Sequence, residues 1–270
     1  MSQSGAERST EGPDEEPQVP YVTAFSRGLS VIRCFSESSP ALTISDVARA
    51  TGLNRATARR FLHTLEADGY VTSNGGRYSL RPKVLDLGYA YLSSISINDI
   101  FQQHLAELAD RLGESCSGGV LEDNDVVFVA RARTSHPRMM TLAISVGSRL
   151  PAHLSAIGRV LLAELPDEEL DDRLRKMELR KETEWTLHQV EGLKDEIRRV
   201  REQGYCVIDQ EVEIGVLAAS VPVRRAGHPT VGISVAVHAS RASVSSLESE
   251  FVPALQNTAV ELEQVLGFRH

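Results

Sequence analysis

The stretch 42-LTISDVARATGLNRATARRFLHTL-65 decides the fold of the first part of the chain. Thr43 and Asp46 have the three-residue spacing of a capping box, which starts a helix. Gly52 suits the end of that helix, because glycine adopts positive φ at little cost. Asn54 can then cap a second helix, whose inward face at helical spacing is Ala58, Phe61, Leu62 and Leu65. Two short helices joined at a glycine predict a helix-turn-helix.

The flanking sequence extends this unit on both sides. Residues 24–34 carry apolar side chains at helical spacing, which predicts a first helix with one buried face. Residues 70–72 and 77–80 alternate as strands do, and Asn74-Gly75-Gly76 can form the turn between them. A hairpin placed directly after the second helix of a helix-turn-helix is a wing. Residues 21–82 are therefore predicted to form a winged helix-turn-helix.

The distribution of charge indicates what this unit binds. The whole chain has a net charge of -8, and residues 1–20 form an acidic segment that is predicted to be a disordered tail. Residues 21–80 reverse the balance, with seven arginines against four acidic residues and a net charge of +3. A locally basic surface attracts the phosphates of double-stranded DNA whatever the total charge of the chain. In the alternative interpretation, the unit is a three-helix module that packs against protein and its arginines are merely solvated.

The predicted recognition helix supplies the residues that could read DNA. Arginine pairs with guanine, and Asn or Thr can meet base edges or phosphates. The groove-facing candidates are Asn54, Arg55, Ala56, Thr57, Arg59 and Arg60. Arg27 and Arg77 are expected to meet the DNA backbone or the minor groove, and Thr43 is a further candidate contact.

The remaining sequence predicts a mixed α+β domain. Residues 98–113 carry an apolar stripe that predicts a linking helix and also suits a dimer. Helices are expected after Pro151, after Pro166 and over 195–203, and a capping box at Ser245-Ser246-Leu247-Glu248 is expected to open the final helix. Strands are expected at 117–121, 126–131, 140–145, 207–208, 216–223 and 231–238.

Several classes of protein are excluded by what the sequence lacks. No apolar run is long enough to span a bilayer and no signal peptide is present, so we expect a soluble, cytoplasmic protein without a membrane partner. Cys34, Cys116 and Cys206 are too scattered for a disulfide framework or a close metal-ligand pair. The chain has no G-x-S-x-G, no phosphate-binding glycine loop and no H-E-x-x-H. We therefore expect neither an enzyme, a cofactor nor a metal.

Several separated motifs resemble the IclR family of bacterial transcription regulators, in the family's order. Beside the helix-turn-helix they are 26-SRGLSVI-32, 78-YSLRPKVLDLG-88, 150-LPAH-153, 155-SAIGRVLLA-163, Gly204-Tyr205, Asp209, Glu211, Glu213, Gly215, Ala219, 221-VPV-223 and 233-ISV-235. The resemblance implies a GAF-like effector-binding domain and homodimers paired into tetramers. With it, the expected organisation is an acidic tail at 1–20, the winged helix-turn-helix at 21–82, linker helices at 83–113 and the effector domain at 114–270.

The same resemblance implies an effector site and an effector class. It places the effector against Met139, Leu142, Leu150, Leu154, Ala156, Gly158, Asp209, Val216, Ala218, Ser234 and Ala236. Ser234 and the backbone amides near Ala156 and Gly158 could hold a carboxylate, with Arg159 as a charge partner. The chain is most similar to the subgroup that controls aromatic-acid catabolism through the β-ketoadipate pathway, which implies a small acid such as protocatechuate, 4-hydroxybenzoate or β-ketoadipate.

Other functions stay open at this stage. They are a regulator of another carbon pathway with a different small acid, a metal- or redox-responsive regulator, an enzyme with an appended DNA-binding domain, and an architectural DNA protein without an effector. If the protein is an activator, RNA polymerase is a further partner.

Overall fold

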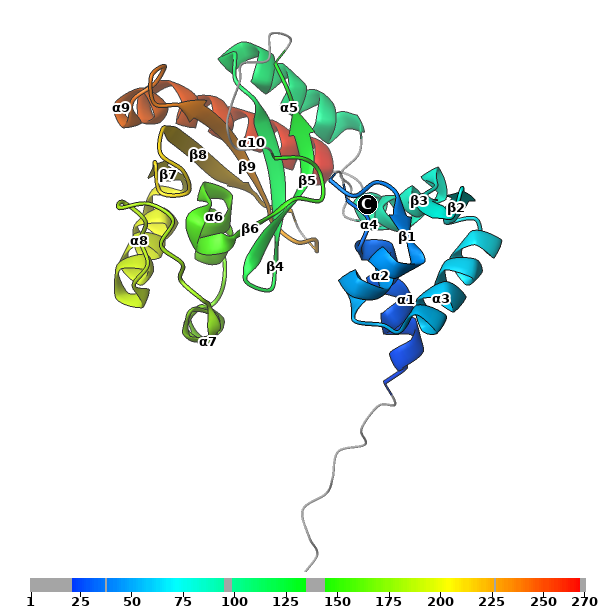
Figure 1. The fold of residues 1–270 in the computed structure, drawn as a ribbon. Helices are drawn as coiled ribbons and strands as arrows, with labels where there is room; N and C mark the ends of the chain where they lie inside the picture. Colours follow the sequence, from blue (N-terminus) through cyan, green and yellow to red (C-terminus); the bar gives the residue numbers. More distant parts are fainter. Residues whose placement is uncertain (1–20, 37, 95–98, 135–143, 226, 268–270) are drawn as a thin grey trace, which may run out of the picture. The chain divides into compact units, whose positions relative to one another are not determined.

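The computed structural model describes residues 21–36, 38–94, 99–134, 144–225 and 227–267, and it divides into two units between Gly88 and Tyr89 (Figure 1). The acidic segment 1–20 lies outside the described residues. The first unit contains α1 (Thr23–Arg33), β1 (Leu42–Thr43), α2 (Ile44–Thr51), α3 (Arg55–Ala67), β2 (Val71–Asn74), β3 (Arg77–Leu80) and the 3-10 turn η1 (Pro82–Val84). The helix α4 (Leu85–Ser94) contains the boundary between the two units.

The predicted helix-turn-helix is confirmed in its local detail. The Thr43 hydroxyl accepts a hydrogen bond from the Asp46 amide, and the Asp46 carboxylate accepts one from the Thr43 amide. These hydrogen bonds lower the pKa of Asp46. Gly52 ends α2 with φ +70°, and the Asn54 side chain accepts from the Thr57 amide at 2.8 Å to start α3. Each helix end is therefore specified by residues within four positions of it.

The wing is an antiparallel hairpin of β2 and β3, with Asn74 paired to Arg77 across the turn. Gly75 and Gly76 both have positive φ, as this tight turn requires. The sequence did not predict β1, which pairs Leu42 with Tyr78 and adds a third strand in the order β1-β3-β2. This short strand fixes the start of α2 to the wing.

The second unit contains a six-stranded antiparallel sheet in the order β6-β5-β4-β9-β8-β7. Helices α5 and α10 cover one face, α6 lies on the other, and α8 packs against α6 (Figure 1). In chain order the elements are α5 (Asp99–Leu112), β4 (Cys116–Glu122), β5 (Asp125–Ala132), β6 (Arg149–Pro151), the 3-10 turn η2 (Ala152–Leu154), α6 (Ala156–Ala163), α7 (Asp167–Lys176), α8 (Val190–Gln203), β7 (Cys206–Asp209), β8 (Val216–Val223), β9 (Val231–His238), α9 (Val244–Ser246), a π-helical turn (Leu247–Phe251) and α10 (Val252–Gly267).

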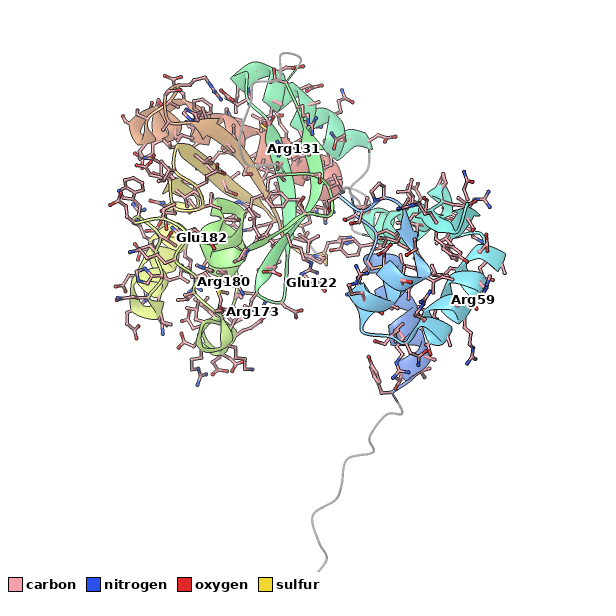
Figure 2. All side chains as sticks on the ribbon, viewed as in Figure 1. Arg59, Glu122, Arg131, Arg173, Arg180 and Glu182 are labelled. Atoms are coloured by element: carbon pink, nitrogen blue, oxygen red, sulfur yellow. The ribbon has the colours of Figure 1, made fainter. Side chains whose placement is uncertain are left out.

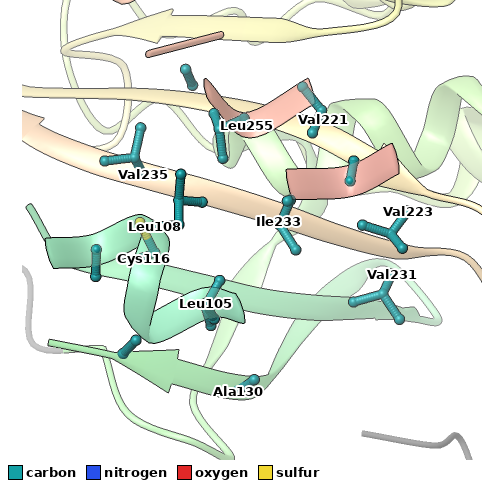
Figure 3. Packing of buried hydrophobic residues seen from close by; sticks show 14 of the residues in the cluster. Leu105, Leu108, Cys116, Ala130, Val221, Val223, Val231, Ile233, Val235 and Leu255 are labelled. Carbon is teal, nitrogen blue, oxygen red and sulfur yellow. The ribbon is translucent and has the colours of Figure 1, made fainter. Parts of the chain in front are cut away.

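The apolar stripe of α5 is buried against the sheet of its own chain. Phe101, Leu105 and Leu108 are almost fully buried, in one core with Ile233 and Val235 of β9. Figure 3 labels Leu105 and Leu108 together with these two residues of β9. A Cβ placed on Gly118 would lie 3.0 Å from the Phe101 ring, so glycine lets the ring approach β4. The expectation that this stripe serves a dimer is therefore wrong, because the stripe is already covered.

Two other local expectations remain to be compared with the structure. The strand expected at 140–145 falls largely outside the described residues, and β6 is an edge strand of the sheet next to β5. The final helical segment begins after Ser243, whose hydroxyl accepts from the Ser246 amide, two residues before the capping box expected at Ser245. Within the residues that the structure describes, no helix is long and apolar enough to cross a membrane.

Candidate DNA-binding surface and effector pocket

The outer face of α3 presents unpaired arginines. Arg55, Arg59 and Arg60 are exposed, and none of them has a hydrogen bond or ion pair through its side chain in the described part of the chain. Figure 2 shows Arg59 extending outward from α3. Asn54 and Ala56 are exposed on the same helix start, whereas Thr57 is half-buried. Three guanidinium groups without internal partners on one recognition helix are available to phosphates and to base edges.

The candidates outside α3 are placed differently. Thr43 is engaged in the capping box, where its hydroxyl also donates to the Asp46 carboxylate at 2.7 Å, so its side chain is already used to start α2. Arg77 is exposed on the wing and donates to the Ala41 carbonyl oxygen at 3.2 Å. Arg27 is exposed on α1. The side chains of Arg27 and Arg77 are exposed to solvent, whereas the Thr43 hydroxyl is used in the capping box.

A cavity of about 50 Å³ lies between the sheet and α6 in the second unit. Its walls come from β4 to β9 and from the segment that leads into α6, and most of the lining side chains are apolar. They are Ser117, Phe128, Arg131, Ile144, Leu150, Leu154, Ser155, Ala156, Ile157, Ile208, Val212, Val216, Ala218, Ser234 and Ala236. This volume is smaller than a cavity that holds a benzene ring, so an aromatic ligand requires the walls to move apart.

Seven of the positions implied by the family resemblance line this cavity, namely Leu150, Leu154, Ala156, Val216, Ala218, Ser234 and Ala236. Met139 and Leu142 lie outside the described residues. Asp209 does not line it, because its exposed side chain stands at the end of β7 and accepts from the Gln210 side chain.

Gly158 does not line the cavity either, and its role is packing. Its amide donates to the Ser155 hydroxyl at 2.9 Å, so the amide is used to cap α6 and is not available to a carboxylate. A Cβ at this position would lie 2.1 Å from the Ala152 carbonyl oxygen, which is far inside van der Waals contact. Gly158 therefore lets η2 and the first turn of α6 touch, and this contact shapes one wall of the cavity.

Arg159 cannot serve as the charge partner of an effector. It is 1% exposed, its Nε donates to the His153 carbonyl oxygen, and both its Nη atoms donate to the Glu211 carboxylate, at 2.8 and 2.5 Å. Burial by itself would lower the pKa of Arg159, but the hydrogen bonds and charge of Glu211 outweigh burial and the pKa is raised. The sequence-based expectation is wrong because the Arg159 charge is already neutralised by a partner 52 residues away.

The cationic residue of the cavity is Arg131, on β5, which the sequence analysis missed (Figure 2). Its Nη1 donates to the Ser117 hydroxyl at 3.1 Å, while its buried Nε has no hydrogen-bond partner in the described residues. Burial, together with the neighbouring charge of Arg133, lowers the pKa of Arg131. A half-buried guanidinium without a carboxylate partner among those residues favours an anionic ligand that would supply the missing charge.

Three polar residues of the cavity form one row across the sheet, and a fourth, Ser155, caps α6. Ser117 of β4 pairs with Arg131 of β5 on one side and with Ser234 of β9 on the other. Directly opposed residues of antiparallel strands project to the same face, so the three side chains lie together at one end of an apolar cavity. The strand period along 126–131 predicts that Ala130 and Arg131 point to opposite faces of the sheet. It does not show which residues of other strands lie beside Arg131.

The cysteines give no support to a metal or redox sensor. Cys116 and Cys206 are fully buried in separate cores, and burial raises the pKa of each to about 12. Cys34 is half-buried and its pKa is also raised. Among the described residues no group of three or more His, Cys, Asp or Glu could hold a metal ion.

An arginine-bearing winged helix in one unit and a small, mostly apolar cavity in the other define a DNA-binding transcription regulator with a ligand pocket. Residues 24–75 match the IclR helix-turn-helix domain, and residues 89–264 match the bacterial transcriptional regulator IclR C-terminal domain. The chain belongs to the IclR family, and it is a regulator rather than an enzyme.

Named relatives agree with this assignment. The chain is 42% identical over 249 residues to the Pca regulon regulatory protein of Pseudomonas putida, covering 92% of this chain and 85% of that protein. A solved transcriptional regulator from Rhodococcus sp. RHA1 is 46% identical with a TM-score of 0.81, covering 91% of this chain and 98% of the other. The inducer-binding domain of PobR from Acinetobacter, solved as a double mutant with 3-hydroxybenzoic acid, is 30% identical with a TM-score of 0.58, covering 62% of this chain and 97% of that domain.

Proposed function

We propose that this chain regulates genes of aromatic-acid catabolism by binding operator DNA through α3 and the wing, under the control of a small aromatic carboxylate. The observation that carries the effector class is Arg131, a half-buried guanidinium with an unused Nε in an otherwise apolar cavity. Support comes from the relatives, since one controls the Pca regulon and another holds 3-hydroxybenzoic acid in its inducer-binding domain.

The cavity suggests how such an acid is held. The carboxylate lies at the row of Arg131, Ser117 and Ser234, where charge-assisted hydrogen bonds are strong, and the ring packs on Leu154 and Val216 at the apolar end. Ala218 and Ala236 carry no polar group, so the row is the part of these walls that orients the acid.

A ligand screen tests this effector class. Purified protein is heated with protocatechuate, 4-hydroxybenzoate, β-ketoadipate and glyoxylate. A ligand at about 100 times its Kd stabilises the folded state by roughly 2.7 kcal/mol. We expect stabilisation by an aromatic acid. Stabilisation by glyoxylate alone would favour a regulator of another carbon pathway, and stabilisation by none of the acids would contradict the proposal.

Replacement of Arg59 by alanine tests the recognition surface. Loss of an arginine that reads a base costs roughly 1 to 3 kcal/mol of binding free energy at the cognate site. The measurement is a gel shift with an operator that the wild-type protein selects from random DNA. Arg175→Ala is the matched control, since Arg175 is an exposed arginine on α7 of the other unit. Operator affinity unchanged by Arg59→Ala, Arg55→Ala and Arg60→Ala alike would contradict the assignment of α3.

The proposed assembly is a homodimer, and two dimers pair into a tetramer. Two recognition helices on a two-fold axis read a palindromic operator. The helix α4 exposes Leu85, Leu87, Tyr89 and Tyr91, an apolar surface that water does not favour. In the proposed dimer, α4 of the second protomer packs against this apolar surface and covers it.

Tyr89→Glu tests this interface, because it places a charge among these apolar side chains. Sedimentation is expected to show at least tenfold weaker self-association. Val260→Glu is the control, because Val260 is a similarly exposed apolar residue on α10. Equal effects of the two substitutions, or no effect of Tyr89→Glu, would exclude α4 as the interface.

The proposed mechanism is a shift of population between two arrangements of the dimer. An effector that binds one arrangement more tightly moves the equilibrium toward it and changes the spacing of the two recognition helices on successive major grooves. The position of the operator relative to the promoter then decides between repression and an activation that involves RNA polymerase.

A further inference from the structure

The segment between β7 and β8 forms part of the cavity wall but has little regular structure to hold it. It supplies Val212, and Val216 follows at the start of β8. Gln210 has φ +57° and Gly215 has φ +85°, so the backbone bends twice through the left-handed region. Local hydrogen bonds close the bend, since the Gln210 amide donates to the Val216 carbonyl oxygen at 2.8 Å and the Gly215 amide donates to the Gln210 side chain at 2.9 Å. Contacts with other segments then hold the bend in its place beside α6.

Glu211 provides those contacts from its side chain and its backbone. Its carboxylate accepts two hydrogen bonds from Arg159 and a third from the Leu187 amide at 2.9 Å. Its carbonyl oxygen accepts from the Thr186 hydroxyl at 2.6 Å, and the adjacent Gln210 carbonyl accepts from the Thr183 hydroxyl at 2.8 Å. Glu211 is 7% exposed, so these bonds form largely out of water.

The ion pair joins two walls of the same cavity. Arg159 lies on α6, and the first turn of that helix contributes Ala156 and Ile157 to the lining. Glu211 immediately precedes Val212 on the opposite segment. The distance between the two walls therefore depends on the ion pair of Arg159 and Glu211, although neither residue lines the cavity.

We propose that Glu211 is a positioning residue of the effector pocket: its bonds to Arg159, Thr186 and Leu187 hold the segment 210–216 against α6 and so set the space that the effector occupies. This inference rests on the proposed effector site. It assigns to Glu211 no contact with the effector.

The only tryptophan in the sequence lies where it can report on this arrangement. Trp185 stands between Thr183 and Thr186, the two threonines that bind the backbone of 210–211, and its amide donates to the Thr183 hydroxyl. Its side chain is 47% exposed. A shift of the segment 210–216 therefore changes the surroundings of the indole, and the fluorescence emission of Trp185 reports that shift.

The test compares Glu211→Gln with the matched control Glu178→Gln in the full-length protein. Glu178 is an exposed residue that pairs with Arg180. Hydrogen bonds to charged groups contribute roughly 1.5 to 3 kcal/mol, which corresponds to about 10- to 150-fold in an equilibrium. For Glu211→Gln we expect amide hydrogen exchange of 212–216 to be at least tenfold faster, a changed Trp185 emission, and at least tenfold weaker binding of protocatechuate and 4-hydroxybenzoate.

A second variant keeps the inference testable if Glu211→Gln does not fold. Thr186→Val removes the bond to the Glu211 carbonyl oxygen, together with the bonds that the same hydroxyl accepts from the Glu182 and Thr183 amides, but leaves the buried ion pair intact. It is expected to shift the same amide exchange and fluorescence by a smaller amount. Unchanged exchange of 212–216 in the folded variants would overturn the inference. If the wild-type protein binds neither acid, the effector class fails, while the exchange measurement still decides the role of Glu211.

Discussion

Replacing Arg131 by methionine is expected to weaken the binding of aromatic carboxylates about 100-fold or more while leaving the chain folded. Removing one partner of a buried charge pair costs roughly 2 to 5 kcal/mol of binding free energy, because the other charge is left without a partner in a desolvated site. Methionine replaces the aliphatic part of the side chain and removes the guanidinium. Without ligand the buried guanidinium is costly, as its lowered pKa indicates, so Arg131→Met is expected to leave thermal stability equal or higher.

Weaker binding of the acids together with equal or higher thermal stability would distinguish loss of a ligand contact from general damage to the fold. Titration calorimetry with protocatechuate and 4-hydroxybenzoate gives the affinity, and thermal unfolding without ligand gives the stability. Arg149→Met is the matched control, because Arg149 lies on the neighbouring strand β6, is exposed and pairs with Asp125 outside the cavity. If Arg131→Met binds the acids as tightly as Arg149→Met does, Arg131 is not the carboxylate anchor.

Replacing Gly158 by alanine is expected to produce the largest loss of stability among the variants considered. The added Cβ would lie 2.1 Å from the Ala152 carbonyl oxygen and 2.4 Å from the Ala152 Cα. Both are backbone atoms, so α6 must move away from η2. Inserting atoms into a packed core costs about 1 to 3 kcal/mol, and more where the obstacle is backbone. A loss of about 3 kcal/mol lowers Tm by roughly 6 to 12 °C in a domain of this size.

Gly192→Ala separates steric overlap from the general effect of removing a glycine. Gly192 lies on α8, and the nearest atom to its added Cβ is 3.9 Å away, an ordinary contact. Alanine in a helix is more favourable than glycine by about 0.5 to 1 kcal/mol. Thermal unfolding should therefore show a lower Tm for Gly158→Ala and an equal or higher one for Gly192→Ala, and equal values would mean that α6 can move freely.

The DNA-binding unit was predictable because its structure depends on short-range interactions. The capping box of Thr43 and Asp46, the positive φ of Gly52 and the cap of Asn54 each involve residues at most four positions apart. Arg59 and Arg60 follow from the same helical period, which turns them away from Ala58 and Leu62, whereas Arg55 is exposed as the first residue of α3. The two-residue strand β1 was missed because only its pairing with β3 defines it.

The effector pocket was predictable only in part. The family motifs found much of the apolar lining and Ser234, but they gave Arg159 as the charge partner of a carboxylate and did not point to Arg131. Periodicity does not distinguish these two arginines, since each lies in a segment with one face toward the sheet core. Their partners distinguish them, because Glu211 neutralises Arg159 and no carboxylate in the described residues pairs with Arg131.

The sequence by itself determined where the helices of the winged unit begin and end, which of their faces are buried, and where most strands of the second unit lie. These features depend on the helical and strand periods and on hydrogen bonds to near neighbours, which the order of residues specifies directly. The tertiary structure alone decided that Arg131 lies beside Ser117 and Ser234, and that Arg159 is paired with Glu211. Those neighbours come from the register of antiparallel strands and from contacts between segments far apart in the chain, because packing against the whole domain selects them.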